Sequence, residues 1–384
     1  MGSVEVMEVS LPRETERFVR TWFTIYENEP NWVPPLYFER KRFFDPRHNP
    51  YFENARVAYF IARKDGRDVG TIAPCIDGGY QEHEAGTAFF GFFEFVDDVE
   101  VAEALLAAAR EWAIGRGMER LIGPFNFNTN HEFGLIVDGF EYPPMVANPW
   151  NAEWYPGIYE AIGLRKAMDW YAYRCDPEMP GMQKMIRVSK RVLSRNPEIE
   201  IRSLDFSRWD EDVEKVREIY RDAWEQNWAH VRVSDREFDF IAGGLKQLID
   251  PDLCFVAEVA GRVAAISVTL PDFNQVVKKM NGRVLPFGWI HVLRRKQLMT
   301  RVRIFMLGVS QEFQSLPLGA ALYARTFEVA IAKGYRYGEA SLILENNHRM
   351  RGALEKMGAV IEKTYRNYEI DLLPEAVATK EGAP

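Results

Sequence analysis

Residues 301–370, RVRIFMLGVSQEFQSLPLGAALYARTFEVAIAKGYRYGEASLILENNHRMRGALEKMGAVIEKTYRNYEI, decide the fold of this 384-residue chain. The stretch opens with an apolar run at 304–309, which predicts a buried strand, and a polar loop follows at 310–317. Apolar side chains at i, i+4, i+7 and i+8 from Tyr323 then predict a helix. Gly334 ends that helix, because glycine tolerates the left-handed conformation.

A second strand is predicted at 339–344, followed by a short helix that Gly358 ends and a last strand at about 361–370. Strand, loop, helix and strand in this order are typical of a βαβ unit. The loop matters most, because the first N–H groups of the helix are unpaired and its positive end faces the same point. Such a corner suits a phosphate or a pyrophosphate.

The loop and the later helix carry a family resemblance. The stretch resembles the acyl-CoA N-acyltransferase superfamily, the GNAT fold, whose members begin this helix with Arg or Gln, two residues, Gly, one residue, then Gly or Ala around the pyrophosphate of coenzyme A. The matching residues are Gln314, Pro317 and Gly319, and the family's later Asn corresponds to Asn347. Pro317 has no N–H to donate. Leu354 stands where many members place the Tyr that protonates the leaving thiolate.

Composition limits the class of protein. A length of 384 residues suits two domains, and 47% hydrophobic with 27% charged residues is typical of globular chains. A net charge of −8 disfavours a general nucleic-acid surface. Three scattered cysteines predict reduced thiols and a cytoplasmic compartment, with no metal site. No apolar run approaches the roughly 18 residues of a membrane span, and no signal peptide is visible.

The order of elements occurs twice along the chain. Gly66 and Gly261 follow the first strand of a predicted hairpin and are 195 residues apart, and the same spacing separates the helix-ending Gly163 and Gly358. Equal spacing at two landmarks indicates two copies of one fold. We therefore predict an α+β, sandwich-like protein with two tandem GNAT-like domains, each a mixed, mostly antiparallel sheet flanked by helices.

The predicted boundaries follow from this repeat. Residues 1–175 form the N-terminal copy, which is degenerate because it has no phosphate loop: an acidic sequence without glycine follows its matching strand. Residues 176–198 form an amphipathic linker helix. Residues 199–374 form the C-terminal copy with the acyl-CoA site, and 375–384 form a tail.

The resemblance implies a coenzyme site in the C-terminal copy. In GNAT enzymes the backbone of the fourth strand pairs with the pantetheine arm, and the helix start holds the pyrophosphate. The donor is then acetyl-CoA or a longer acyl-CoA, and the implied binding residues are Leu307, Gly308, Val309, Gln314, Leu318, Gly319, Ala320 and Asn347. For Asn347, capping of the next helix is an equal alternative.

Catalysis needs a base for the amine and an acid for the thiolate. Glu345, at the end of the second strand, is the first choice of base, directly or through water, and Glu339 shares its face. The alternative for Glu345 is a cap or a surface carboxylate. Tyr365 is a substitute for the missing acid, with core packing as its alternative.

The acceptor pocket is expected in an insertion of the N-terminal copy, from 126 to about 150. Amides and aromatic side chains gather there and suit a small-molecule pocket at the domain junction, while turns and caps are the alternative use. The predicted substrate-binding residues are Asn126, Asn128, Glu132 and Tyr155.

Eight basic residues gather around a second insertion, in the C-terminal copy. They fit the 3′-phosphate of the coenzyme or an acidic acyl-carrier protein, or else form a solvated face. They are Lys278, Lys279, Arg283, Arg294, Arg295, Lys296, Arg301 and Arg303.

The resemblance and the residues together predict an acyl-CoA-dependent N-acyltransferase that moves an acyl group to an amine of a small molecule or peptide. One alternative is a non-catalytic tandem-GNAT protein that binds acyl-CoA or another small ligand, because Pro317 and Leu354 depart from the family pattern. A Fem-like aminoacyl transferase is the other.

Overall fold

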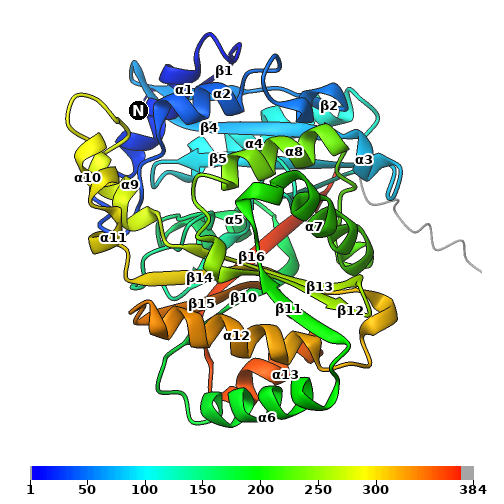
Figure 1. The fold of residues 1–384 in the computed structure, drawn as a ribbon. Helices are drawn as coiled ribbons and strands as arrows, with labels where there is room; N and C mark the ends of the chain where they lie inside the picture. The colour runs from blue at the N-terminus through cyan, green and yellow to red at the C-terminus, as the bar shows by residue number, and fades with distance from the viewer. Residues whose placement is uncertain (1, 373–384) are drawn as a thin grey trace, which may run out of the picture.

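The computed structural model describes residues 2–372 and contains one large mixed sheet flanked by helices (Figure 1). The strands are β1 (Glu5–Glu8), β2 (Ala55–Val57), β3 (Phe60–Lys64), β4 (Arg67–Asp77), β5 (Thr87–Phe95), β6 (Arg120–Gly123), β7 (Phe125–Asn126), β8 (Glu132–Phe133), β9 (Leu135–Asp138), β10 (Arg165–Cys175), β11 (Ile199–Ser203), β12 (Cys254–Val259), β13 (Arg262–Pro271), β14 (Arg301–Val309), β15 (Tyr337–Leu344) and β16 (Val360–Asp371).

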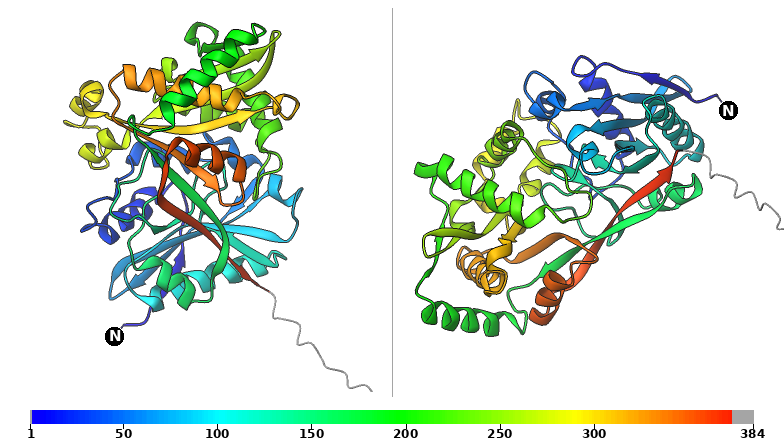
Figure 2. Two further views of the ribbon diagram at one scale, coloured as in Figure 1. Left: turned by 90° about the horizontal axis from the view of Figure 1, so that it is seen from below. Right: turned by 90° about the vertical axis from the view of Figure 1, so that its right-hand side faces the viewer.

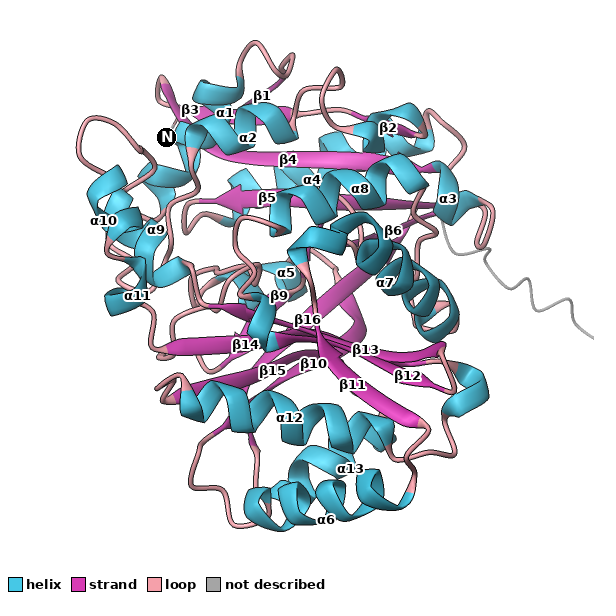
Figure 3. Ribbon diagram, in the orientation of Figure 1, coloured by secondary structure: helices cyan, strands magenta, loops and turns pink. Residues whose placement is uncertain are grey.

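Helices lie on both sides of the sheet and between its halves (Figure 3). They are α1 (Thr15–Ile25), α2 (Tyr37–Phe43), α3 (Gly78–Gln81), α4 (Val99–Ile114), α5 (Tyr155–Ala161), α6 (Met182–Arg195), α7 (Trp209–Trp224), α8 (Asp235–Leu245), α9 (Asn274–Met280), α10 (Trp289–Leu293), α11 (Arg295–Leu298), α12 (Leu318–Ala332) and α13 (His348–Met357).

The predicted repeat is present in the backbone. Gly66 and Gly261 lie at the turns of the β3–β4 and β12–β13 hairpins with φ of 78° and 79°. Gly163 and Gly358 follow α5 and α13 with φ of 88° and 98°. Positive φ is the conformation that glycine adopts at little cost, so the glycine spacing reported a real structural repeat. The tandem α+β fold is confirmed.

The last strands of the two halves are exchanged. The principal strand order is β1-β3-β4-β5-β6-β16-β10-β15-β14-β13-β12-β11. Thus β16, from the C-terminal half, pairs with β6 of the N-terminal half, while β10 pairs with β15 of the C-terminal half. β10 and β16 also pair with each other, and both cross the middle of the molecule in Figure 2. The N-terminal and C-terminal halves therefore complete each other's sheets.

The two halves bury different cores. Aromatic rings dominate the N-terminal core, where Phe92 and Phe127 pack against rings from α1 and α2. In the C-terminal half, α12 packs on α6 and on the sheet, because nearly every face of α12 is apolar and Leu322 and Phe327 are buried. The predicted linker at 176–198 thus contains α6, lying on α12.

Two segments differ from the patterns in the sequence. Residues 29–51, which read as a loop, contain α2, a helix that buries only Phe43 and so carries little apolar periodicity. Residues 55–62, which read as one strand, divide into β2 and β3. Both strands pair with β4. The pairing of β2 ends at Val57↔Cys75 and that of β3 begins at Phe60↔Ile72, so residues 58 and 59 separate the two strands. Each half also contains an insertion with its own secondary structure. The first insertion contains β7, β8 and β9, and the second contains α9, α10 and α11.

Candidate active site

The site begins where β14 and β15 separate. These parallel strands pair from Arg301↔Tyr337 to Ile304↔Ala340. Beyond that point β14 stays paired with β13 as far as Val309, and β15 stays paired with β10 as far as Leu344. The two strands therefore diverge, and their facing backbone N–H and C=O groups become available to an extended ligand.

The start of α12 faces this gap. Pro317 is the N-cap residue, and no side chain among residues 2–372 caps the helix. The N–H groups of the first turn are thus free for an anion at the positive helix end. A Cβ built on Gly319 would have its nearest neighbour at 3.7 Å, so the backbone is open to close approach. The proline removes one N–H before the helix but none of those within its first turn.

Arg349 adds a positive charge to this corner. Its guanidinium donates a hydrogen bond to Oε1 of Gln314 at 3.2 Å and another to the backbone oxygen of Gln314. Both residues line the cavity described below. Sequence reasoning missed Arg349, although a basic residue at the start of the helix after the second strand was visible in His348-Arg349.

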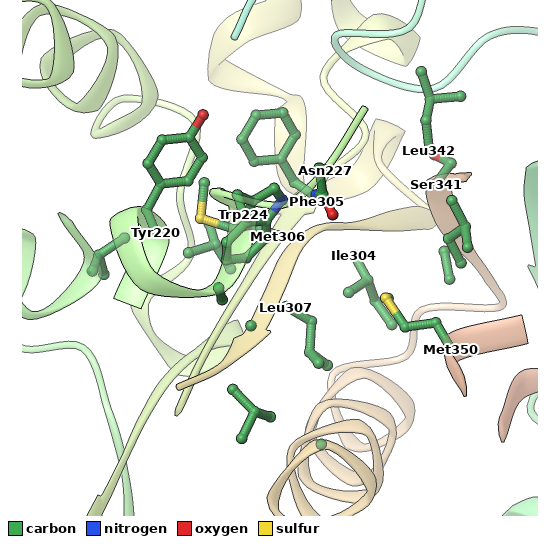
Figure 4. Close-up of a pocket in the computed structure, with 18 of the residues that line it drawn as sticks. Tyr220, Trp224, Asn227, Ile304, Phe305, Met306, Leu307, Ser341, Leu342 and Met350 are labelled. Carbon is green, nitrogen blue, oxygen red and sulfur yellow. The ribbon is translucent and has the colours of Figure 1, made fainter. Parts of the chain in front are cut away.

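A cavity of about 540 Å³ connects the gap to the junction of the two halves (Figure 4). Its walls are mostly apolar and come from β14, β15, α7, α8 and α12, with contributions from the N-terminal half. Gly308 lets one wall form, because a Cβ there would lie 2.2 Å from the ring of Trp224. The apolar lining includes Phe133, Trp170, Val213, Val216, Trp224, Trp228, Phe238, Ile241, Leu245, Phe305, Met306 and Leu342.

Polar groups from the insertion of the N-terminal half lie at one end of this cavity. Tyr220 donates a hydrogen bond to Oδ1 of Asn130, and burial raises the pKa of the tyrosine. Burial also lowers the pKa of His131 to about 3, so its imidazole is neutral. Oδ1 of Asn128 lies 3.0 Å from its Nδ1, and Nε2 has no partner within the described chain.

A buried ionic network supports the point where the strands separate. Arg303 is 3% exposed and donates hydrogen bonds to the backbone oxygens of Ser341 and Val146. Burial lowers the pKa of Arg303 to about 10. Glu339 accepts hydrogen bonds from Ser341 and Asn148, and its other oxygen lies 2.6 Å from Nζ of Lys363, in a pair with no exposed surface.

An aromatic hydroxyl lies among the residues around this point. Tyr323, on α12, is 2% exposed and lines the cavity, and its hydroxyl has no hydrogen-bond partner among residues 2–372. It belongs to the same buried cluster as Ile304, Ala340 and Leu354. Burial raises the pKa of Tyr323, so the phenol keeps its proton at neutral pH and can donate a hydrogen bond.

The residues predicted for coenzyme binding are largely gathered at this site. Leu307, Gly308, Val309, Gln314, Gly319, Ala320 and Asn347 line the cavity, and Leu318 packs in the neighbouring core instead. The side chain of Asn347 accepts the N–H of Met350 at 3.1 Å and so caps α13. Their roles in binding stay predictions.

The residues predicted for catalysis lie outside the cavity lining. Glu345 pairs with Lys166 at 2.7 Å and accepts the N–H of Asp169. Glu339 lies in the buried network described above, and Tyr365 is fully buried with no partner for its hydroxyl within the described chain. These roles stay predictions too.

The predicted acceptor residues do not line the cavity. Asn126 accepts the N–H of Phe92. Asn128 donates to Asp77, Glu132 pairs with Arg40 at 2.9 Å, and Tyr155 donates to Glu94. Their neighbours Thr129, Asn130, His131 and Phe133 form part of the lining. Sequence reasoning missed the walls from α7 and α8, because their amphipathic pattern does not indicate what their apolar faces cover.

The matching place in the N-terminal half is filled by side chains. β5 and β6 pair only from Thr87↔Arg120 to Phe89↔Ile122, as β14 and β15 do over four positions. Beyond them Phe95 stacks on Tyr155, with ring centroids 4.3 Å apart. The matching helix, α4, is capped by the carboxylate of Asp98. An anion would meet a negative charge there.

Metal-binding clusters and membrane-spanning helices are both absent from residues 2–372. No group of three or more His, Cys, Asp or Glu side chains is placed to hold a metal ion. No helix in this range combines the length and the apolar composition needed to cross a bilayer.

Comparisons with known proteins agree with this geometry. No family model matches the chain. Among solved structures, a tandem GNAT protein from the clavulanic acid biosynthesis pathway superposes over 97% of this chain and 99% of its own, with a TM-score of 0.59 at 13% identity. A probable N-acyltransferase from Enterococcus faecalis V583 covers 96% of this chain and 73% of its own, with a TM-score of 0.51 at 8% identity. The fold is therefore that of a tandem GNAT protein.

Two curated proteins are similar in sequence over nearly the whole length. The bacterial ceramide synthase of Caulobacter vibrioides is 35% identical over 376 residues, covering 96% of this chain and 97% of its own. Protein YghO of Escherichia coli K12 is 32% identical over 368 residues, covering 93% and 92%. The chain therefore belongs to the same family as these two proteins.

Proposed function

We propose that the protein is an acyl-CoA-dependent N-acyltransferase that acylates the primary amine of a long-chain amino alcohol. The observation that carries the proposal is the continuity between the gap beside α12 and the apolar cavity under α7 and α8. Such a cavity favours long alkyl chains over a polar peptide acceptor, because it removes apolar surface from water. The relative named bacterial ceramide synthase supports an acceptor of this class.

The start of α12 and Arg349 would hold the pyrophosphate of the donor, and the free edges of β14 and β15 would pair with its pantetheine arm. The thioester then lies close to Ile304 and Ala340, where the strands meet. This placement brings the reacting carbon to the vertex of the gap and the alkyl chains into the apolar walls.

The amine must be neutral when it attacks the thioester carbon. An apolar cavity disfavours the ammonium form, so burial itself lowers the pKa of the amine. We keep Glu345 as the proton acceptor through water, since Lys166 and the N–H of Asp169 already occupy its carboxylate. The tetrahedral intermediate collapses to the amide as the C–S bond breaks.

Tyr323 is our proposed acid for the departing thiolate. Its protonated, unpartnered hydroxyl lies in the same cluster as Leu354, the residue that replaces the family's usual tyrosine. The tyrosine on α12 would thus protonate the thiolate, which in many GNAT enzymes is done by a tyrosine on the helix that corresponds to α13.

The test incubates the purified protein with acyl-CoAs of several lengths and either a long-chain amino alcohol such as sphinganine or short polar amines. We expect free coenzyme A and the N-acyl product in equal amounts, with the long-chain amine strongly preferred. Binding of acyl-CoA without release of thiol would support the ligand-binding alternative. Equal turnover of short polar amines would contradict the proposed acceptor.

A further inference from the structure

The second insertion forms a lobe at one side of the molecule, built from α9, α10, α11 and their connections (Figures 1 and 2). We call residues 274–298, from the start of α9 to the end of α11, the basic-apolar lobe. The chain as a whole has a net charge of −8, yet residues 273–311 contain no Asp or Glu at all. The lobe is therefore a positive region on an acidic protein.

The cations of the lobe are not neutralised by acidic side chains, although Lys278 donates a hydrogen bond to the backbone oxygen of Pro30 and Arg283 lies over the ring of Tyr37. The exposed basic residues have no carboxylate within 4 Å in residues 2–372. The basic side chains that follow the lobe behave differently, since Arg301 pairs with Asp272 and Arg303 is buried. The exposed cations are Lys278, Lys279, Arg283, Arg294, Arg295 and Lys296.

Large apolar side chains are interleaved with these cations. Thirteen large hydrophobic residues are exposed in the described chain, and five of them fall within 285–293. The most exposed are Leu285, Phe287 and Leu293, at 73%, 71% and 74%, and Trp289 and Ile290 lie between them. Single exposed apolar residues are ordinary, but a group of five in nine positions is not.

The lobe is attached to the rest of the fold. The N–H of Tyr37 donates to the oxygen of Gly282 at 3.2 Å, and the glycine lies so close to Phe23 that a Cβ there would be 2.6 Å from its ring. Nε1 of Trp289 donates to the oxygen of Pro286 at 2.9 Å, which fixes the indole. The apolar tips are thus presented on a supported surface.

We propose that the basic-apolar lobe docks the protein on an anionic lipid bilayer surface. Apolar and aromatic tips enter the interface between headgroups and acyl chains, while the surrounding cations meet lipid phosphates. An acidic carrier protein would explain the cations but not the exposed Leu285, Phe287 and Leu293. Docking on a bilayer is independent of the proposed acyl transfer. Its test uses neither donor nor amine, so the failure of one proposal does not affect the other.

Helix α6 supplies a matched control. It also carries exposed cations, Lys184, Arg187 and Arg191, but its buried face is covered by α12 and Val188 is its only large exposed apolar residue in the described chain. Three charge reversals there change the net charge by the same amount as three reversals in the lobe.

The experiment is co-sedimentation of the full chain with vesicles of phosphatidylcholine, with or without phosphatidylglycerol. Wild type is expected to bind only the anionic vesicles, and R294E/R295E/K296E and L285S/F287S/L293S should each weaken binding by more than about tenfold. K184E/R187E/R191E should bind like wild type, and thermal unfolding will show that all variants are folded.

Three results would overturn the proposal. The first is equal binding of wild type to neutral and anionic vesicles, or to neither. The second is equal loss in the α6 variant, which would indicate net charge alone. The third is vesicle binding that survives L285S/F287S/L293S while an acidic acyl-carrier protein binds the chain through the same cations.

Discussion

Tyr323 is the residue on which the proposed chemistry can be tested most directly. Its hydroxyl is buried, protonated and without a partner in the described chain, and its side chain belongs to the buried cluster that contains Ile304 of β14 and Ala340 of β15. An unpaired buried hydroxyl costs free energy in the folded protein. We therefore expect bound acyl-CoA to supply its hydrogen-bond partner.

We expect Tyr323→Phe to lower kcat by about 10- to 100-fold, because general acid catalysis of thiolate departure would be lost. KM for acyl-CoA should change little, since the ring remains. Steady-state thiol release measures both constants, and Tyr335→Phe, on a tyrosine that does not line the cavity, is the control. Unchanged kcat in Tyr323→Phe would remove this residue from the mechanism.

The buried ion pair of Glu339 and Lys363 is expected to affect the stability of the fold rather than catalysis. Both side chains have no exposed surface and lie 2.6 Å apart. Lys363→Met leaves the buried carboxylate of Glu339 without its cation and removes a 3.2 Å contact with Glu362, so we expect a loss of about 3–5 kcal/mol in the free energy of unfolding. The double change Glu339→Gln/Lys363→Met should recover much of it. Urea unfolding provides the values.

The exposed pair of Arg20 and Glu16 is the comparison, with side chains 61% and 68% exposed. Arg20→Met should cost less than about 1 kcal/mol, because solvent screens the pair. If Lys363→Met lowers the free energy of unfolding by a similarly small amount, water reaches the remaining carboxylate and solvates it.

At the scale of elements, the start of α12 decides the donor site. Gly319→Glu places a carboxylate in the first turn, where it favours the helix dipole but repels a pyrophosphate. A Cβ fits there without a clash, so the variant should fold. We expect KM for acyl-CoA to rise by more than about tenfold, since a hydrogen bond to a charged group contributes about 1.5–3 kcal/mol.

Gly319→Gln is the control, with the same shape and no charge. It should raise KM for acyl-CoA, measured by steady-state kinetics, much less than Gly319→Glu does. Equal effects of the two variants would indicate crowding rather than charge and would place the pyrophosphate elsewhere.

Helix α8, which covers the cavity, carries a titratable group facing the N-terminal half. Burial and then the charge of Asp77 raise the pKa of Glu237 to about 8. The native state therefore keeps the proton that the unfolded chain loses near its ordinary pKa. Stability from the protonated form is complete below that ordinary pKa and falls as pH rises toward about 8.

Glu237→Gln removes this dependence. We expect the variant to be more stable than wild type at pH 8, by an amount on the order of 3 kcal/mol, and the difference to disappear near pH 4.5. Thermal unfolding across this pH range measures it. A constant difference at all pH values would assign the effect to packing.

At the scale of the whole molecule, the exchanged strands join the two halves. β10 and β16 pair along most of their length, and each lies inside the sheet of the other half. Removing either half would leave a buried strand edge open. The halves are therefore expected to unfold together although they are copies of one fold.

Calorimetry of the full chain should show one unfolding transition, with calorimetric and van't Hoff enthalpies in agreement. A chain that ends at residue 198 lacks β16 and should aggregate or remain unfolded. Two well-separated transitions, or a stable folded half, would contradict the coupling.

Local patterns predicted much of the architecture. The strand at 304–309, the helix after the loop and the paired glycines reported the tandem fold, because periodicity and positive φ are properties of short segments. The same patterns predicted the gathering of Gln314 and Gly319 beside β14. They missed Arg349, which hydrogen-bonds Gln314, and Tyr323, which packs in one cluster with Ile304 and Ala340, because these contacts join residues far apart in the sequence.

The sequence by itself determined most of the strands and helices, that the fold occurs twice, and that the first copy has an acidic sequence without glycine where the second copy has its loop before α12. The tertiary structure alone decided that the last strands exchange, that α7 and α8 cover the cavity, and that an apolar, basic lobe faces outward. The physical reason is that an amphipathic pattern specifies which face of an element avoids water. It does not specify which partner covers that face, since many apolar surfaces and strand edges satisfy the same requirement.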